Sequence, residues 1–182
     1  MGGKVQLTVQ TNKDTFPATG GQQLTYVLIE AMPTGIVADV KMPLNFSLVL
    51  DHSGSMSGAK LENLKEAAKL AVDQMCPHDL LSIVIFDDKV KVVASSQPVS
   101  DGRGLKELID DIRAGGGTAI SRGMKEGLQE LHKGVGSDRV SRMLLLTDGE
   151  TFGDEDACRR LAADAGGAGI PIVALGLGEE WN

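Results

Sequence analysis

The segment Phe46-Ser47-Leu48-Val49-Leu50-Asp51-His52-Ser53-Gly54-Ser55 joins a continuous apolar run to a cluster of polar side chains. An apolar run of this length is typical of a strand that is buried on both faces, as the strands of parallel sheets are. Asp51 ends the run, and serines follow it at every second position. If the backbone stays extended there, the three side-chain oxygens project to one side. The segment therefore predicts a buried strand with a polar site at its carboxyl end.

The chain from residue 44 onward alternates between strand-like and helix-like patterns. Helical spacing of apolar residues predicts helices at 61–75, 105–112, 120–131 and 154–165. Apolar runs predict further strands at 80–86, 90–94, 143–147 and 171–176. The predicted strands 80–86 and 90–94 are joined by only three residues, Asp87-Asp88-Lys89. A connection this short can join only antiparallel strands. We therefore predict an α/β fold, with a doubly wound and mostly parallel sheet, one antiparallel edge strand and helices on both faces.

Residues 1–43 show a different pattern. Val5 to Val9 alternates strictly between apolar and polar residues, and Leu24 to Ile29 is a second β-rich run. Proline and glycine lie between the two runs, so the pattern predicts a small pair of antiparallel strands. The residues from Met32 to Pro43 are rich in breakers and predict a connection. We therefore divide the chain into an N-terminal β extension, residues 1–43, and an α/β domain, residues 44–182.

Composition excludes several classes of partner. The 182 residues carry a formal net charge of -7, and the acidic residues are spread along the chain, which argues against a nucleic-acid or anionic-membrane partner. No run reaches the roughly 18 apolar residues of a membrane helix, so membrane insertion is not expected. The N-terminus lacks the apolar stretch of a signal peptide, which favours a cytoplasmic protein. Cys76 and Cys158 form no metal-binding pair, and we expect both to be reduced and in or near the core.

Two further segments supply oxygen donors to the edge of the sheet where ligands bind in such folds. Asp148 follows the strand 143–147, and a run of three glycines delivers Thr118 just before a helix. Taken singly, these residues have ordinary explanations, since Asp148-Gly149 is a common turn and Thr118 is a natural helix N-cap. Together with Asp51 and its serines, they give two carboxylates and three hydroxyls. That donor set suits a hard cation such as Mg²⁺, whereas zinc would favour histidine and cysteine.

This set, Asp51-x-Ser53-x-Ser55 with Thr118 and Asp148, resembles the metal-ion-dependent adhesion site (MIDAS) of von Willebrand factor A (vWA) domains, which have a Rossmann-like fold. The resemblance implies that Ser53, Ser55 and Thr118 offer hydroxyls to the metal. Asp51 and Asp148 then act mainly through bound waters or switch between direct and water-mediated contact. It also implies Mg²⁺, with Mn²⁺ or Ca²⁺ as alternatives, and an open coordination position for an Asp or Glu carboxylate of a protein partner. The expected function is therefore metal-dependent adhesion or assembly.

The resemblance covers roughly residues 44–178, and the chain departs from the family at both ends. Related domains usually add a sixth strand and a closing helix, so we expect residues 44–182 to lack these elements. Either the sequence is a fragment of the domain or the sheet has a bare edge after its last strand. The N-terminal strand pair resembles the start of a β-sandwich that some multidomain relatives complete downstream. Because unpaired strand edges are templates for pairing with another chain, these features favour a homodimer through exposed strands.

Two alternative functions stay open. One is a metal-assisted hydrolase or phosphotransferase, because acidic strand ends that hold Mg²⁺ also serve phosphoryl transfer. Against it, the sequence has no second aspartate two residues after Asp51 and no GxxxxGK[ST] loop. His52 is adjacent to Ser53, so the two side chains are expected to point apart. The other alternative is a structural module that uses no metal.

Other charged residues have simpler explanations. We expect a solvated helix face made by Lys60, Glu62, Lys65, Glu66 and Lys69. Glu150 and Thr151 follow the second site aspartate, and they either line the rim where the ligand binds or are ordinary loop residues.

Overall fold

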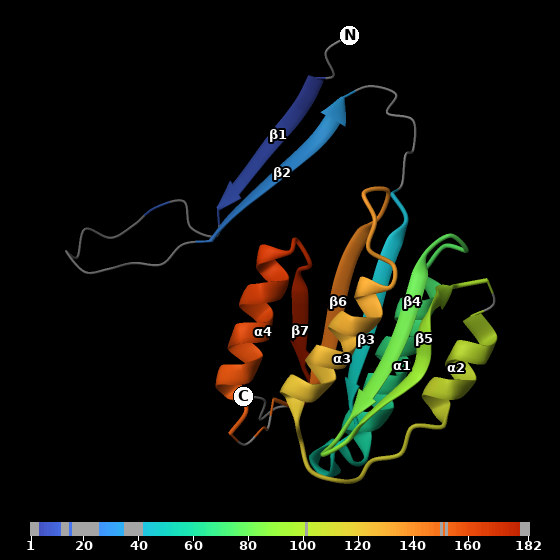
Figure 1. Ribbon diagram of the computed structural model, residues 1–182. Helices are drawn as coiled ribbons and strands as arrows, with labels where there is room; N and C mark the ends of the chain where they lie inside the picture. Colours follow the sequence, from blue (N-terminus) through green and yellow to red (C-terminus); the bar gives the residue numbers. More distant parts are fainter. Residues whose placement is uncertain are drawn as a thin grey trace. The chain divides into compact units, whose positions relative to one another are not determined.

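The structure is a computed structural model that describes residues 4–11, 15, 26–34, 42–100, 102–149, 151 and 153–178 (Figure 1). The chain divides into two compact units, Met1–Lys41 and Met42–Asn182. Each unit is described by itself.

The N-terminal unit contains one antiparallel strand pair. β1 (Lys4–Thr11) pairs with β2 (Val27–Thr34), from Lys4 opposite Thr34 to Thr11 opposite Val27. The pair confirms the two predicted strands. The predicted connection from Met32 onward begins too early, because β2 continues to Thr34. Pro33 lies within β2, opposite Val5. A two-stranded ribbon tolerates this, because both of its strands are edge strands and proline needs only a position where no N–H is required.

The second unit is built on a five-stranded sheet in the order β5-β4-β3-β6-β7 (Figure 1). Its strands are β3 (Leu44–Asp51), β4 (Leu80–Phe86), β5 (Val90–Pro98), β6 (Val140–Thr147) and β7 (Ile172–Gly176). The pairs are parallel except β4 with β5, which confirms the predicted antiparallel edge strand. β3 is therefore the central strand.

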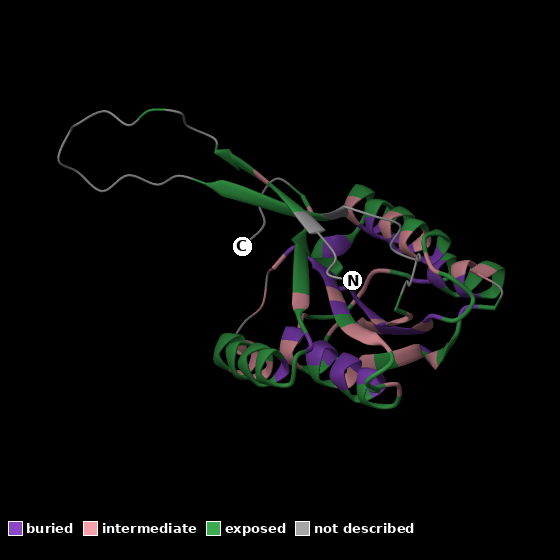
Figure 2. Cartoon of the chain, turned by 90° about the horizontal axis from the view of Figure 1, so that it is seen from above, coloured by how far each residue is buried: buried purple, intermediate pink, exposed green. Residues whose placement is uncertain are grey.

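Helices cover both faces of this sheet (Figure 1). The helices are α1 (Ala59–Asp73), α2 (Gly102–Asp110), α3 (Ile120–His132) and α4 (Glu155–Gly167). Leu48 and Leu50 pack into the core with α1 and α2, whereas Val49 packs into the core with α3 and α4. The central strand is thus buried on both faces, as its continuous apolar run predicts (Figure 2).

Two glycines bring α3 close to the sheet. A Cβ atom on Gly127 would lie 2.5 Å from Cγ2 of Val49, and one on Gly123 would lie 2.5 Å from Cδ1 of Phe86. Only glycine leaves room for this approach. Because α3 is seated so closely, its first turn is fixed at the end of the sheet where β3 and β4 finish.

The cysteines differ from each other in burial. Cys76 is exposed just beyond the end of α1, so the expectation that it lies in or near the core was wrong. Cys158 is half-buried on α4 against the core of that face. Burial, together with Asp154 and Glu155, raises the pKa of the Cys158 thiol to about 11. The Cys158 side chain is therefore a neutral thiol at physiological pH.

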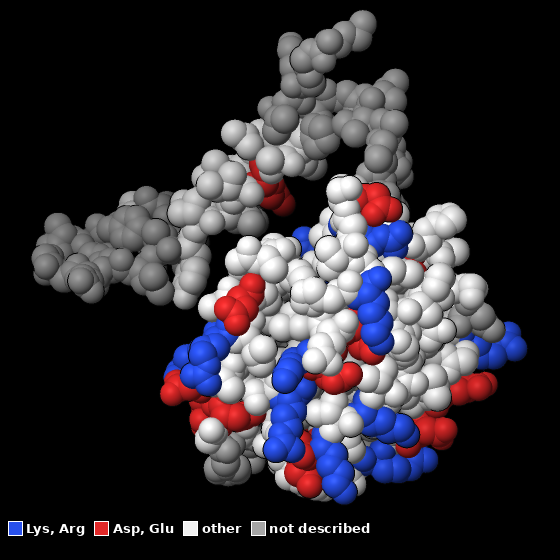
Figure 3. Space-filling model, viewed as in Figure 1, with Lys and Arg blue, Asp and Glu red and all other residues white. Residues whose placement is uncertain are grey.

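The surface of the second unit carries both signs of charge. On the face that Figure 3 shows, lysines and arginines alternate with aspartates and glutamates. Among the described helices, none has the length and apolarity needed to span a bilayer.

Candidate metal centre

The carboxyl ends of β3 and β6 form the point where the chain changes direction across the sheet. From β3 the chain continues through α1 to β4 on one side, and it later returns to the other side of β3 as β6. In open α/β sheets, ligands bind at such a switch point. Asp51 is the last residue of β3, and Asp148 directly follows β6. We call this end of the sheet, with Asp51, Thr147 and Asp148, the carboxyl edge.

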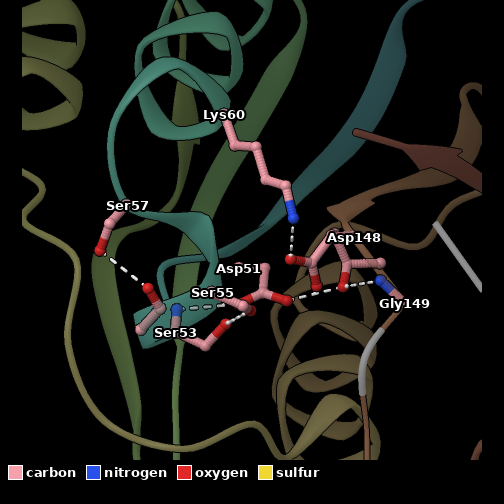
Figure 4. Close-up of polar contacts among 9 residues, drawn as sticks. Asp51, Ser53, Ser55, Ser57, Lys60, Asp148 and Gly149 are labelled. Carbon is pink, nitrogen blue, oxygen red and sulfur yellow. Dashed lines mark hydrogen bonds and ion pairs between the residues drawn. The ribbon is translucent and has the colours of Figure 1, made fainter. Parts of the chain in front are cut away.

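Asp51 is fully buried and is held from two sides. Its Oδ1 accepts a hydrogen bond from the backbone N–H of Ser53 at 2.8 Å, and its Oδ2 accepts one from the Thr147 hydroxyl at 2.6 Å. The Thr147 hydroxyl in turn accepts the N–H of Gly149 at 3.0 Å (Figure 4). These bonds connect the ends of β3 and β6. Sequence analysis did not single out Thr147, although its place as the last strand residue before Asp148 was the available signal.

The two serines of the motif lie side by side on the loop after β3. Ser53 Oγ and Ser55 Oγ are 3.1 Å apart (Figure 4). Ser53 is buried, and Ser55 is exposed. A short 3₁₀ turn, η1 (Gly54–Met56), shapes the loop, and the buried Met56 side chain anchors it in the core. The loop thus presents two hydroxyl oxygens beside Asp51.

Backbone hydrogen bonds fasten the glycine loop to the serine loop. The N–H of Gly115 donates to the carbonyl of His52 at 2.8 Å, and the N–H of Gly54 donates to the carbonyl of Gly116 at 3.1 Å. Gly116 has a φ of +74°, and a Cβ atom there would lie 2.5 Å from carboxylate oxygens of Asp87 and Asp88. Glycine is therefore required at this position. The bonds bring the loop that carries Thr118 to the carboxyl edge.

Thr118 does not cap α3, so its ordinary explanation as a helix N-cap was wrong. The N-cap position is Ala119, which makes no side-chain cap. The first turn of α3 is capped instead by Asp154, whose Oδ2 accepts the N–H of Ser121 at 2.7 Å. Within the described part of the chain, the Thr118 hydroxyl makes no hydrogen bond. This hydroxyl is therefore available to a ligand.

Lys60 reaches the carboxyl edge from α1. Its Nζ lies 2.8 Å from Oδ2 of Asp148, whose side chain is fully buried, while the Lys60 side chain is 28% exposed. The expectation of a wholly solvated helix face was wrong for Lys60, for Lys65, which is buried, and for Lys69, whose side chain is 22% exposed. Long lysine stems pack against apolar surface and bring the ammonium to a carboxylate. Glu62 and Glu66 are exposed, as expected.

The carboxyl edge concentrates negative charge in a buried place. Burial raises the pKa of Asp51 above its ordinary value, and the negative charge of Asp148 raises it further. Hydrogen bonds from Thr147 and Ser53 lower the pKa but do not outweigh burial. An ionised carboxylate in this position is costly unless a cation is near. A bound cation would remove that cost.

The donor set fits a hard divalent ion. Among the described residues, no group of three His, Cys, Asp or Glu side chains could hold a metal, so an ion here needs hydroxyl ligands beside carboxylates. Oxygen donors of this kind suit Mg²⁺, whereas zinc sites in proteins more often use histidine and cysteine. His52 does not contribute a nitrogen, since its Nδ1 lies 2.9 Å from the carbonyl of Arg113 and its Nε2 lies 3.9 Å from Asp87.

The predicted rim residues are only partly described. Glu150 lies outside the described residues. The Thr151 hydroxyl donates to Oδ1 of Asp154 at 2.5 Å, so Thr151 supports the capping aspartate of α3.

Comparison with known proteins identifies the family. The family model for the von Willebrand factor type A domain matches residues 45–182. The chain belongs to the vWA family. Domains of this family are generally interaction modules, are commonly involved in protein–protein adhesion, and bind a divalent metal at their MIDAS.

Curated relatives are much longer than this chain. An uncharacterised protein of Synechocystis is 45% identical over 145 residues, which are 79% of this chain and 34% of that protein. Human inter-alpha-trypsin inhibitor heavy chain H3 is 29% identical over 155 residues, covering 78% of this chain and 17% of the relative. The chain therefore spans about a third of the length of the first relative and about a sixth of the second.

Solved structures share the fold. A von Willebrand factor type A protein from Catenulispora acidiphila matches with a TM-score of 0.68 at 23% identity, over 97% of this chain and 41% of that one. Proximal thread matrix protein 1 from the mussel byssus, with a zinc-occupied MIDAS motif, matches with a TM-score of 0.64 at 21% identity. That match covers 74% of this chain and 38% of the mussel protein. At these identities, the matches establish the fold alone.

Proposed function

We propose that this chain is a divalent-metal-dependent protein-binding module. A Mg²⁺ ion, or Mn²⁺ or Ca²⁺ in its place, is held by Asp51, Ser53, Ser55, Thr118 and Asp148. The ion binds an Asp or Glu carboxylate of a protein partner. The observation that carries the proposal is the pair of buried carboxylates at the switch point of the sheet, with two serine hydroxyls 3.1 Å apart beside them.

The charges of the donors explain why such a site suits recognition. Three of the five proposed donors are neutral hydroxyls, which leave part of the ion's positive charge uncompensated. When bound, the ion supplies an electrophilic position that a carboxylate from outside can complete. The family membership supports this proposal, and so does the MIDAS motif of the mussel protein, which holds a zinc ion in a similar fold.

A hydrolase or phosphotransferase is less well supported, and we propose that the chain is not an enzyme. Such an enzyme needs a base within hydrogen-bond reach of its nucleophile. His52 is the histidine next to the serines, but its ring nitrogens lie near the Arg113 carbonyl and Asp87 instead. A screen for phosphatase and esterase activity in Mg²⁺ separates this alternative from a binding module.

The direct test is calorimetric titration with Mn²⁺. The double variant Ser53→Ala/Ser55→Ala removes two proposed ligands and is expected to abolish binding. The matched control is Ser100→Ala/Ser137→Ala, which removes two exposed serine hydroxyls elsewhere and should bind as the wild type does. Binding of Mn²⁺ at full affinity by the first double variant would rule out this site. Absence of binding by the wild type would favour a structural module that uses no metal.

We also propose that the β1–β2 pair is part of a β-sandwich whose remaining strands are supplied by a further segment of polypeptide. Its apolar side chains are exposed on both faces, since neighbouring residues Leu28 and Ile29 are 54% and 63% exposed. A two-stranded pair by itself is at best marginally stable. Pairing between copies of this chain would cover these strands, and light scattering at high concentration should then report a dimer. A monomer at every concentration would contradict this pairing.

A further inference from the structure

Lys60 places a positive charge of the chain itself on one of the proposed metal ligands. It is the second residue of α1, and its Nζ lies 2.8 Å from Oδ2 of Asp148. Figure 4 shows the ammonium reaching Asp148 from α1, beside the Asp51 carboxylate and the serine hydroxyls. The ammonium therefore offsets part of the negative charge that a divalent ion would use.

The backbone after β7 restricts where the Lys60 side chain can go. Gly178 has a φ of +100°, and a Cβ atom there would lie 2.8 Å from Cε of Lys60 and 3.6 Å from its Nζ. The lysine stem thus packs directly against the Gly178 backbone on one side and reaches Asp148 at its tip. The Lys60 side chain therefore has contacts at both its stem and its tip.

We propose that Lys60 is a positioning residue that holds Asp148 and sets the balance between metal binding and carboxylate binding at this site. The proposal rests on the metal-binding function proposed above. An ammonium beside a metal ligand repels the incoming divalent ion, which lowers the affinity for the metal. The same positive charge stays near the bound ion and attracts a partner's carboxylate. One unit of charge at this range is expected to change each affinity about tenfold, in opposite directions.

The test compares Lys60→Met with Lys69→Met. Methionine keeps an apolar stem and removes the charge. Lys69 also lies on α1 but pairs with Glu66 and Asp110, so its replacement is the matched control. We expect Lys60→Met to bind Mn²⁺ about tenfold more tightly in calorimetry, and its Mn²⁺-loaded form to bind acetate about tenfold more weakly. Lys69→Met and Lys60→Arg should match the wild type in both measurements.

Thermal melting separates positioning from a purely structural role. In chelator, Lys60→Met should melt at a lower temperature than Lys69→Met, and saturating Mn²⁺ should raise its melting temperature by more than that of the wild type. Equal Mn²⁺ affinity in Lys60→Met and the wild type would overturn the role of Lys60 alone. A parallel loss of Mn²⁺ and acetate affinity in Lys60→Met would do the same. Failure of all four proteins to bind Mn²⁺ would overturn both this inference and the proposed function.

Discussion

Buried carboxylates lie at both ends of the same sheet, but their surroundings differ. At the amino edge, where β3, β4 and β6 begin, Asp79 and Glu130 are almost fully buried. Asp79 accepts the backbone N–H groups of Leu44 and Cys76, each at 2.7 Å. Glu130 accepts the Ser95 hydroxyl and the Ser96 N–H, each at 2.9 Å, and Lys133 at 2.5 Å. At the carboxyl edge, Asp51 and Asp148 lie near each other, and Asp148 forms an ion pair with Lys60.

The pKa shifts show what this difference means. Burial raises the pKa of Glu130, but hydrogen bonds from Lys133, Ser96 and Ser95 outweigh it, so the pKa lies below the ordinary value. Burial dominates at Asp51, whose pKa lies above the ordinary value. The Glu130 anion therefore stabilises the fold, whereas the more deeply buried Asp51 anion is costly. Glu130 also pairs with the Lys133 ammonium, whereas Asp51 makes no ion pair with another described residue and is suited to hold a cation.

Replacement of Asp51 should separate metal binding from stability most strongly. Asp51→Asn removes the charge but keeps the size, and we expect the Mn²⁺ affinity to fall at least about 100-fold. The stability of the metal-free protein should not fall, because the neutral amide avoids the cost of a buried anion. Calorimetry and denaturant unfolding in chelator measure the two quantities. A variant that loses stability and metal affinity together would show that Asp51 belongs with the amino-edge carboxylates.

Replacement of Asp79 should have the opposite outcome. Asp79→Ala leaves two backbone N–H groups without their acceptor, and we expect a loss of about 2 kcal/mol in the free energy of unfolding. Mn²⁺ affinity should stay at the wild-type value, because Asp79 lies at the other end of the sheet. Asp138→Ala is the control, since its side chain is 71% exposed. A fall in metal affinity in Asp79→Ala would remove the distinction between the two edges.

The glycine loop allows a smaller perturbation of the carboxyl edge alone. Gly116→Ala forces a side chain onto a left-handed backbone, and we expect it to cost about 1.5 kcal/mol of stability and to weaken Mn²⁺ binding by displacing the Thr118 loop. Gly115→Ala is a close control, because a Cβ atom at Gly115 meets nothing within 4 Å. Urea unfolding and Mn²⁺ titration of both variants test this. Equal behaviour of the two would show that the loop conformation does not matter to the site.

The sequence predicts the strand-end aspartates of the site, but it does not predict the contacts made by Thr147 and Lys60. Apolar periodicity identifies strands and helices, and strand ends locate Asp51 and Asp148 at the same edge of the sheet. Thr147 and Lys60 act through contacts with residues 96 and 88 positions away. Local pattern does not report which hydroxyl or ammonium reaches a distant carboxylate. Lys60 therefore resembles its exposed neighbours in sequence, although packing turns it toward the site.

Acidification should remove the contribution of Glu130 to the stability of the amino edge. Because the pKa of Glu130 is lower in the folded than in the unfolded protein, its contribution to stability is present above the ordinary glutamate pKa and is lost as the pH falls through the folded-state pKa. Glu130→Gln should therefore be less stable than the wild type at pH 7, by about 1 kcal/mol, and the two should converge in acid. Denaturant unfolding in chelator from pH 7 downward measures this. The control is Glu126→Gln, the same replacement on the same helix. A constant difference between Glu130→Gln and the wild type at all pH values would mean that the charge of Glu130 does not stabilise the amino edge.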